Sequence, residues 1–270
     1  MAKKRKFKLT ARTADRYVLY TDAVQTVQAE VTFFKRLYET HNGCPPVLLR
    51  EDFCGTAALC CQWAHIAPDN RAIGVDLDPE PLSWSRGHYL ALLPADARKR
   101  IRLRRADVLE VKTPRPDVIC ALNFSFCVFK RREVMLRYLR KSCRDLAPGG
   151  IMVMDIYGGP EGQKVMTEST PFKGYTYIWD QACYNPVTHE ALNHIHFHFR
   201  DGTKMRKAFT YDWRLWTLAE LTDLLAEAGF RESRVYWEDT GPDGEGNGVY
   251  RHRRRADAEE GWVAYVIGLK

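Results

Sequence analysis

Two apolar segments joined by a tight turn and a helical pattern constrain the fold of this chain most strongly. The first segment and its turn occupy 48–59, and the second runs from Arg71 to Asp78 with a carboxylate at its end. Apolar runs that alternate with helical patterns are typical of parallel strands buried under helices. The turn presents backbone N–H groups and a helix N-terminus to a ligand, and the carboxylate can accept two hydrogen bonds from a ribose diol. The pattern predicts a nucleotide-type cofactor site at the edge of a parallel sheet.

The same alternation continues through the first 160 residues. Apolar residues at spacings of three and four predict one or two helices within 12–41, ahead of the sheet. Candidate strands lie at 47–53, 71–77, 101–106, 117–123 and 151–157, separated by candidate helices at 57–66, 79–93 and 129–146. This order predicts an α/β fold with a doubly wound, mostly parallel sheet and helices on both faces. Pro148-Gly149-Gly150 stops the last of these helices.

A different pattern follows the fifth strand. Residues 176–213 alternate like antiparallel strands, with turns at Asn185-Pro186 and Asp201-Gly202. We therefore expect an antiparallel β lid over 158–214, inserted beside the parallel sheet.

The C-terminal part returns to the helix and strand pattern. Thr217 and Glu220 form a capping box for a helix that Gly229 closes. Two final strands near 233–238 and 262–269 then flank a Gly-rich and Arg-rich loop at 240–256.

Cysteine usage and hydropathy indicate the setting of the protein. None of the eight cysteines forms a C-x-x-C pair, and several lie in apolar runs where a thiol behaves as a small hydrophobic group. No run of about 18 apolar residues is present, and the basic segment 1–8 lacks the apolar stretch of a secretory signal. These features predict a cytoplasmic protein without membrane association.

The net charge of +7 is concentrated in three basic runs. Residues 1–16 carry +6, residues 98–105 carry +6 and residues 251–255 carry +4, so the remainder of the chain has a net charge of −9. This distribution suits RNA only if the three runs converge on the mouth of the site. For the run at 98–105, the preferred explanation is that Arg102 and Arg104 protect an exposed sheet edge from pairing.

The ordered motifs resemble class I S-adenosylmethionine-dependent methyltransferases over about 45–269. The first family motif, acidic-x-Gly-x-Gly-x-Gly, corresponds to 51–57 and keeps only Gly55. Phe53 and Ala57 occupy the outer glycine positions, so we expect a differently shaped backbone near the methionine part of the cofactor. The resemblance implies a Rossmann-like seven-stranded sheet that ends in an antiparallel β-hairpin.

The resemblance also implies which residues bind S-adenosylmethionine. Glu51 would face the methionine amine or its loop, with Asp52 as the neighbouring alternative. Asp76 would bind the ribose hydroxyls, whereas Asp78 is a weaker candidate that also suits the N-cap of the following helix. Asp107 would lie near the adenine amino group. The full predicted set is Tyr20, Glu51, Asp52, Phe53, Cys54, Gly55, Thr56, Asp76, Leu77, Asp107, Val108, Asn123 and Phe124.

Residues at the ends of the fourth and fifth strands are candidates for the acceptor side. Methyl transfer from a sulfonium is a one-step displacement, so the protein mainly aligns the nucleophile and excludes water. Asn123 can accept a hydrogen bond from an amine, while Phe124 and Phe126 either wall the pocket or pack a turn. Tyr157 ends the fifth strand and is a candidate for contact with the acceptor.

Three histidines alternate with apolar residues in the lid, at His194, His196 and His198. Period two places all three imidazoles on one face of a strand. Three imidazoles are chemically adequate metal ligands, but their spacing requires adjustment and no further ligand can be identified, so we predict no metal. We expect this face to be the solvent or substrate side of the lid, with His194 or His196 available as a general base.

The sequence thus predicts a single methyltransferase domain over 1–270. Its expected parts are a basic tail and helices at 1–44, a cofactor-binding core at 45–157, the lid at 158–214, and a closing helix and β-hairpin at 215–270. The expected activity is methylation of a nitrogen or oxygen of a small molecule. The alternatives are an RNA or protein methyltransferase that uses the basic tail and the Arg-rich loop, and a noncatalytic binding protein that retains the fold.

Overall fold

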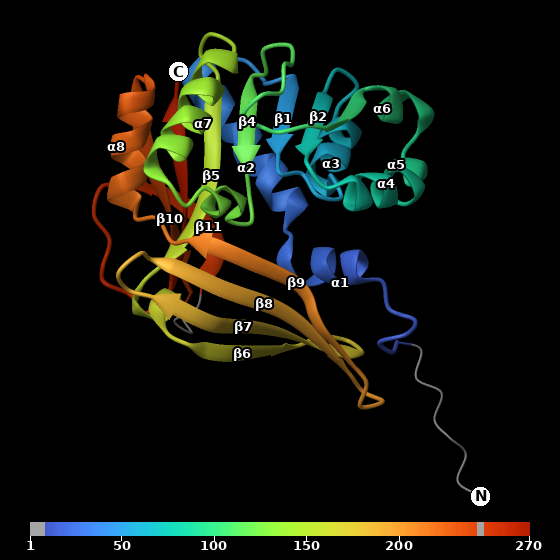
Figure 1. The fold of residues 1–270 in the computed structure, drawn as a ribbon. Coiled ribbons are helices and arrows are strands. Elements are labelled where there is room, and N and C mark those ends of the chain that lie inside the picture. Colours follow the sequence, from blue (N-terminus) through green and yellow to red (C-terminus); the bar gives the residue numbers. More distant parts are fainter. Residues whose placement is uncertain (1–8, 242–245) are drawn as a thin grey trace, which may run out of the picture.

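The computed structural model describes residues 9–241 and 246–270, and Figure 1 shows two sheets with helices around the larger one. The N-terminal half contains α1 (Arg16–Val24), α2 (Val27–Asn42), β1 (Leu48–Asp52), α3 (Ala58–Ile66), β2 (Arg71–Asp76), α4 (Pro79–Gly87), α5 (Tyr89–Leu92), α6 (Ala95–Lys99), β3 (Ile101–Arg105), β4 (Val118–Ala121), the 3-10 turn η1 (Ser125–Val128) and α7 (Arg132–Asp145). The C-terminal half contains β5 (Ile151–Gly158), η2 (Pro160–Gln163), β6 (Met166–Pro171), β7 (Tyr175–Asn185), β8 (Glu190–Phe199), β9 (Lys204–Arg214), α8 (Leu218–Ala228), β10 (Glu232–Thr240), β11 (Gly246–Arg253) and β12 (Trp262–Leu269).

The large sheet of the described residues has the strand order β11-β10-β12-β5-β4-β1-β2-β3. Strands β1 to β5 run parallel to their neighbours, whereas β12 pairs antiparallel with β5 and β10. The expected α/β fold with a mostly parallel sheet is therefore confirmed. Its two apolar faces pack separately, because β4 directs Ile119 and Ala121 toward the α7 and α8 side and Val118 and Cys120 toward the α2 and α3 side.

The sheet has eight strands in the described part of the chain, one more than expected. The loop predicted at 240–256 is largely replaced by β11, which pairs antiparallel with β10; the loop residues 242–245 lie outside the described residues. Glycine in this segment indicated a loop, but Gly246 has a packing reason, since a Cβ there would lie 2.5 Å from the carboxyl carbon of Glu238. Strand pairing in the tertiary structure thus overrides the local composition.

Local signals located the ends of several helices. Thr217 and Glu220 form the predicted capping box of α8, and Gly229 ends that helix with φ of 98°. Asp78 is the N-cap of α4 and accepts the backbone N–H of Glu80 at 2.9 Å. The helix expected at 79–93 is divided into α4 and α5 at His88.

The lid is a separate antiparallel sheet of the order β6-β7-β8-β9. Its turns lie at the predicted Asn185-Pro186 and Asp201-Gly202 positions, between β7 and β8 and between β8 and β9. Figure 1 shows β9 as the lid strand nearest to the large sheet and to α1. An edge strand of the lid therefore faces the ends of the parallel strands.

The basic runs at 98–105 and 251–255 lie far apart in the sheet. Residues 98–105 include β3, and residues 251–255 begin in β11, and these two strands form the opposite edges of the large sheet. Arg102 and Arg104 are exposed on the edge strand β3, as the edge-protection interpretation requires. Within the described ranges, no helix is long and apolar enough to cross a membrane.

Candidate cofactor and acceptor site

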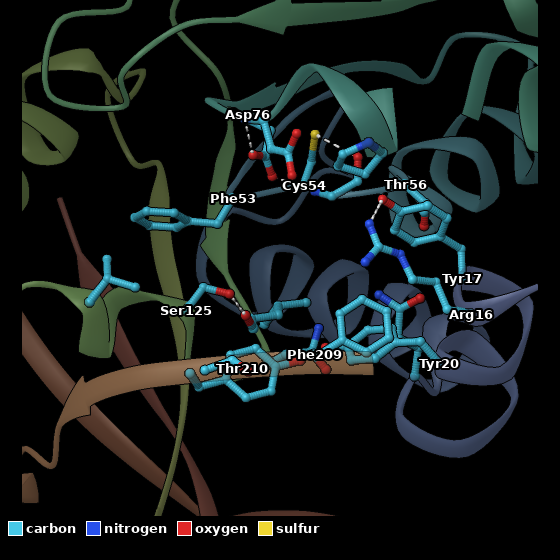
Figure 2. Close-up of a pocket in the computed structure, with 18 of the residues that line it drawn as sticks. Arg16, Tyr17, Tyr20, Phe53, Cys54, Thr56, Asp76, Ser125, Phe209 and Thr210 are labelled. Carbon is cyan, nitrogen blue, oxygen red and sulfur yellow. Dashed lines mark hydrogen bonds between the residues drawn. The ribbon is translucent and has the colours of Figure 1, made fainter. Parts of the chain in front are cut away.

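A cavity of about 490 Å³ lies where the carboxyl ends of β1, β2 and β4 meet α1 and β9. Figure 2 shows Phe53, Cys54 and Asp76 on the side of the parallel sheet, with Phe209 and Thr210 of β9 on the opposite side. Arg16, Tyr17 and Tyr20 of α1 close one end of this space. This volume is within the usual range of small-molecule sites, and its place at the strand ends is usual for open α/β sheets.

The turn after β1 retains left-handed backbone at the positions that carry glycine in the family motif. Phe53, Gly55 and Ala57 have φ of 59°, 49° and 55°. Two of the three residues carry a side chain in this conformation, which costs about 1–2 kcal/mol per residue. The expected difference in backbone shape from the family stays a prediction. A Cβ at Gly55 would meet no atom within 4 Å, so this glycine leaves its face open to a ligand.

A packed aromatic cluster supports the strained turn. The ring of Phe53 lies 5.7 Å from that of Phe129 and 5.9 Å from that of Tyr138, between ring centroids. The hydroxyl of Tyr138 in turn donates to Asp52 Oδ2 at 3.0 Å. The side chain that replaces the first glycine therefore contributes packing that glycine would not.

Asp52 lines the cavity, but its carboxylate is also part of a buried ion network. The side chains of Arg50 and Asp52 are fully buried, with Nε and Oδ1 3.0 Å apart, and Arg50 Nη1 also donates to Asp145 Oδ2 at 2.6 Å. Of the two candidates for the methionine amine, Glu51 is therefore the better placed, since Asp52 already has a cationic partner.

Glu51 lines the cavity as a buried carboxyl group. Its Oε2 accepts the backbone N–H of Cys60 at 3.2 Å. Burial raises the pKa of Glu51 to about 7, and the charges of Asp76 and Asp52 act in the same direction. A cationic ligand group beside Glu51 would stabilise its ionised form.

Asp76 connects the end of β2 to the first turn. Its Oδ2 accepts the N–H of Gly55 at 2.7 Å, and its Oδ1 accepts the N–H of Asp78 at 2.9 Å. Burial raises the pKa of Asp76, against the effect of these hydrogen bonds. A carboxylate has about four acceptor positions, so both oxygens can still accept from a diol.

A second left-handed turn follows β4. Asn123 and Phe124 have φ of 54° and 57°, and their N–H groups donate to the buried carboxylate of Asp155 at 2.8 and 2.9 Å. Burial raises the pKa of Asp155 to about 7. Asp155 therefore orients the backbone that brings Asn123 to the cavity.

The structure brings most, but not all, of the predicted residues to one place. Lining the cavity are Tyr20, Glu51, Asp52, Phe53, Cys54, Gly55, Thr56, Asp76 and Asn123. Leu77, Asp107, Val108, Phe124, Tyr157, His194 and His196 do not line it. Asp107 instead accepts the N–H of Leu109 at 2.8 Å, and Val108 is a core residue.

The histidines lie on the lid face turned away from the cavity. Ile195 and Phe197 belong to the apolar cluster that includes Leu19 of α1, so the alternating imidazoles take the other side of β8. His194 and His196 are only 4% and 9% exposed, although we expected a solvent or substrate face. Neither histidine lines the cavity, although His194 Nδ1 lies 3.0 Å from Oγ1 of Thr210, which does. The general-base role of His194 or His196 stays a prediction.

His196 is held by hydrogen bonds at both ring nitrogens. Its Nδ1 accepts the backbone N–H of Lys207 at 2.9 Å, which places the ring proton on Nε2, 3.1 Å from Asp180 Oδ2. Lys207 lines the cavity. It has φ of 50° and lies where the pairing of β8 with β9 is irregular. His196 therefore supports the backbone of the lid wall from behind.

Sequence reasoning missed two cationic residues of the cavity, Arg16 and Lys207. Arg16 Nη2 donates to the hydroxyl of Tyr17 at 2.9 Å and to Glu80 at 2.6 Å, and thus connects α1 to α4. Arg16 lies four residues before Tyr20 and therefore on the same face of the helix, so the sequence could have indicated that both residues reach the cavity. Lys207 had no such signal, because an irregularity in strand pairing brings it to the cavity. Across the described ranges, no group of three or more His, Cys, Asp and Glu side chains is arranged to hold a metal ion.

Comparisons with known proteins identify the fold. No family model matches the chain, and no curated protein is significantly similar to it. Among solved structures, it is similar to the amino pentose methyltransferase CalS10 from Micromonospora echinaspora, with 17% identity, a TM-score of 0.63 and coverage of 92% of this chain and 95% of that one. The sugar N-methyltransferase KedS8 from Streptoalloteichus has 18% identity and a TM-score of 0.63 over 100% of this chain and 97% of that one.

A third similar structure supports the same assignment. An S-adenosylmethionine-dependent methyltransferase from Clostridium acetobutylicum has 17% identity and a TM-score of 0.64, with 93% of this chain and 96% of that one covered. The chain therefore has the fold of class I S-adenosylmethionine-dependent methyltransferases, as its motifs predicted. Because identity is low, this similarity concerns the fold, and the activity has to be argued from the cavity.

Proposed function

We propose that this protein is a methyltransferase that uses S-adenosylmethionine and methylates a small molecule. The observation that carries the proposal is the convergence of Glu51, Gly55 and Asp76 on one cavity of about 490 Å³ at the ends of the parallel strands. The open face of Gly55 admits a ligand close to the backbone. Asp76 is placed for a ribose diol, and Glu51 for an ammonium group. These residues fit the cofactor, which supplies a methyl group on a sulfonium when bound.

We favour nitrogen over oxygen as the acceptor atom. Among the described lining residues there is no histidine, and burial raises the pKa of both Tyr20 and Tyr211, so neither phenol is a ready base. An unprotonated amine needs no proton removal before it attacks, whereas an alcohol gains from a general base. The chain then mainly positions the acceptor and excludes water through α1 and β9. Methylation of alcohols in preference to amines would reverse this choice.

A small acceptor is favoured over a polymer by the enclosure of the site. The helix α1 and the edge strand β9 cover the cavity, and Arg16 ties α1 to Glu80 across its rim. The basic runs at 98–105 and 251–255 lie on opposite edges of the large sheet, whereas an RNA site needs the basic runs to converge on the mouth. Salt-sensitive tRNA binding accompanied by tRNA methylation would favour the polymer alternative.

Calorimetry with S-adenosylmethionine and S-adenosylhomocysteine tests cofactor binding directly. Replacement Asp76→Ala should weaken binding by about 1–3 kcal/mol, because the ribose loses a charged hydrogen-bond partner and Gly55 loses its anchor. Asp69→Ala is the matched control, since Asp69 is exposed and lies outside the cavity. If the wild-type protein binds neither compound, the fold serves a noncatalytic role; unchanged affinity in the Asp76 variant would refute the ribose assignment.

A transfer assay then tests the activity. Radiolabelled S-adenosylmethionine is incubated with the protein and separate panels of small amines and small alcohols. Label is expected in amine products, and its absence from both panels despite tight cofactor binding would contradict the proposed acceptor class.

A further inference from the structure

A second cavity, of about 250 Å³, lies beside the larger one. It is formed by the end of β5, the start of β12, η2 and the lid strands β6 and β7. Trp213, which lines the larger cavity, has its ring centroid 6.1 Å from that of Phe124 and 6.2 Å from that of Trp179, and both of these residues line the smaller one. Neighbouring aromatic rings thus border both spaces.

Aromatic rings make up much of the lining of the smaller cavity. Phe124, Tyr157, Trp179 and Trp262 come from four different parts of the chain and meet here. The rings of Phe124 and Tyr157 are tilted at 56° with centroids 4.7 Å apart, so they present different surfaces to the cavity. Aromatic rings attract a cation that lies over their faces, through the ring quadrupoles.

Glycines keep the space between these rings free. A Cβ on Gly158 would lie 2.3 Å from the ring of Trp262, and one on Gly162 would lie 3.3 Å from the ring of Tyr157. Side chains at these two positions would therefore displace the rings that form the wall. The absence of side chains here has a packing consequence that favours an open, aromatic space.

The charge of the lining has one sign. Glu161 and Glu168 line the cavity, and its described lining includes no lysine, arginine or histidine. The carboxylate of Glu161 lies against Gly261, because a Cβ on Gly261 would be 2.8 Å from Oε2 of Glu161. Two carboxylates beside aromatic faces complement a positive ligand group and disfavour a negative one.

We propose that this smaller cavity binds a cationic group, a protonated or quaternary ammonium, on the methyl acceptor. This assignment rests on the proposed function, since it describes a second part of the molecule that is methylated in the larger cavity. A volume of about 250 Å³ is below the usual range of whole-ligand pockets and suits an ammonium with a few carbon atoms. The acceptor then has two parts, one on each side of Trp213.

Choline and its uncharged isostere 3,3-dimethylbutan-1-ol are the probes for a test. Both are titrated against the full chain without cofactor, with the indole signal of Trp262 followed by NMR. Choline is expected to bind at least about fivefold more tightly, because only the charged probe gains from rings and carboxylates. Equal affinities for the two probes would overturn the proposal.

Variants locate the binding. Trp262→Ala is expected to weaken choline binding about tenfold, and Glu168→Gln is expected to weaken it severalfold. Ligand-observed NMR measures choline binding in both variants. Glu168 is exposed, so its replacement tests the site even if the tryptophan variant does not fold. Glu110→Gln removes the same charge from an exposed position outside the cavity and should leave choline binding unchanged. Equal choline binding by wild type and Glu168→Gln would contradict the assignment.

Separate titrations distinguish this proposal from the proposed function. S-adenosylhomocysteine affinity should be the same in wild type and Glu168→Gln, because the smaller cavity does not include Gly55 or Asp76. If the protein binds choline more tightly than 3,3-dimethylbutan-1-ol but does not bind the cofactor, the result contradicts the proposed function and supports the cation site. Cofactor binding without discrimination would remove only the cation site.

Discussion

The two walls of the large cavity are constructed differently. The wall from the parallel sheet is a left-handed turn at Phe53, Gly55 and Ala57, fixed by the carboxylate of Asp76. The wall from the lid is the edge strand β9, whose irregular segment is held by a side chain, His196.

Because of this difference, changes in the two walls should affect different properties: the stability of the whole molecule and the shape of the acceptor side. The sheet wall rests on fully buried charges and core aromatic rings, so its disruption should affect folding of the whole molecule. The lid wall rests on hydrogen bonds within a second sheet, so its disruption should change the acceptor side and leave the cofactor side intact. Four changes, arranged by expected size, test this contrast.

Replacement Arg50→Met should have the largest effect. It leaves Asp52 buried without its cationic partner, and loss of one member of a buried ion pair typically costs about 3–5 kcal/mol. Urea denaturation measures the change in the free energy of unfolding. Arg132→Met is the surface control, because Arg132 pairs with Glu227 in solvent and an exposed pair contributes little to stability. Similar losses in both variants would contradict a special role of the buried network.

A pair of glycine variants measures the strain of the first turn. Ala57 and Ala64 are both 0% exposed, so Ala57→Gly and Ala64→Gly remove the same buried methyl group. At Ala57, glycine relieves the left-handed strain and should raise the free energy of unfolding by about 1 kcal/mol. At Ala64, inside α3, glycine should lower the free energy of unfolding by about 1 kcal/mol, because it is a poor helix former. We expect Ala57→Gly to be the more stable variant by about 2 kcal/mol. Equal unfolding free energies would show that the turn is unstrained.

The pH dependence of cofactor binding tests Glu51. Its pKa is raised to about 7 by burial, so the cofactor-free carboxyl becomes charged as the pH rises through 7. If the charged form receives the cofactor ammonium, affinity should fall up to about tenfold for each pH unit below 7. Calorimetry between pH 5.5 and 8 should show this slope in wild type and a weaker, flatter profile in Glu51→Gln. An unchanged slope in the variant would assign the titration to another group.

The same pKa predicts the opposite trend for cofactor-free stability. The neutral carboxyl is favoured in the folded state, so the stabilising contribution of Glu51 is complete below its unfolded pKa of about 4.3 and is lost as the pH rises through 7. Glu30 and Asp155, with pKa values raised to about 8 and 7 by burial, act in the same direction. Comparison with Glu51→Gln isolates the part due to Glu51.

Replacement His196→Ala should have a smaller effect on stability than loss of the Arg50 pair, about 0.5–1.5 kcal/mol for each of the two lost hydrogen bonds. Because Lys207 loses the acceptor of its N–H, the lid wall should shift, and KM for the acceptor should rise severalfold while cofactor affinity is unchanged. His198→Ala is the control on the same face of β8, since His198 takes no part in holding Lys207. A loss of cofactor affinity in the His196 variant would show that the two walls are not independent.

Local sequence signals predicted the parts that depend on neighbouring residues. The parallel strands β4 and β5 are largely apolar, the capping box at Thr217 and the N-cap at Asp78 each involve residues within one helical turn, and Asp76 ends its strand. Such features are visible in a sequence because their partners lie nearby in it.

Features that depend on distant pairing were not predictable in the same way. The strand β11 was expected to be a loop because its glycines and arginines carry no strand pattern, yet β10 provides its partner. The period of His194 and His196 was right, but period two does not say which face meets the cavity. The apolar face of β8 packs against Leu19 of α1, and this contact turned the histidines away.

The sequence by itself determined the alternation of strands and helices in the parallel part of the sheet and the carboxylates at the strand ends, because backbone periodicity and capping are local. The tertiary structure decided which of those residues share a cavity, which carboxylate is already paired, and that Arg16 and Lys207 belong to the site. It also decided the conformation of the first turn. Packing of Phe53 and the hydrogen bond from Gly55 to Asp76 accompany left-handed backbone at two residues that carry side chains.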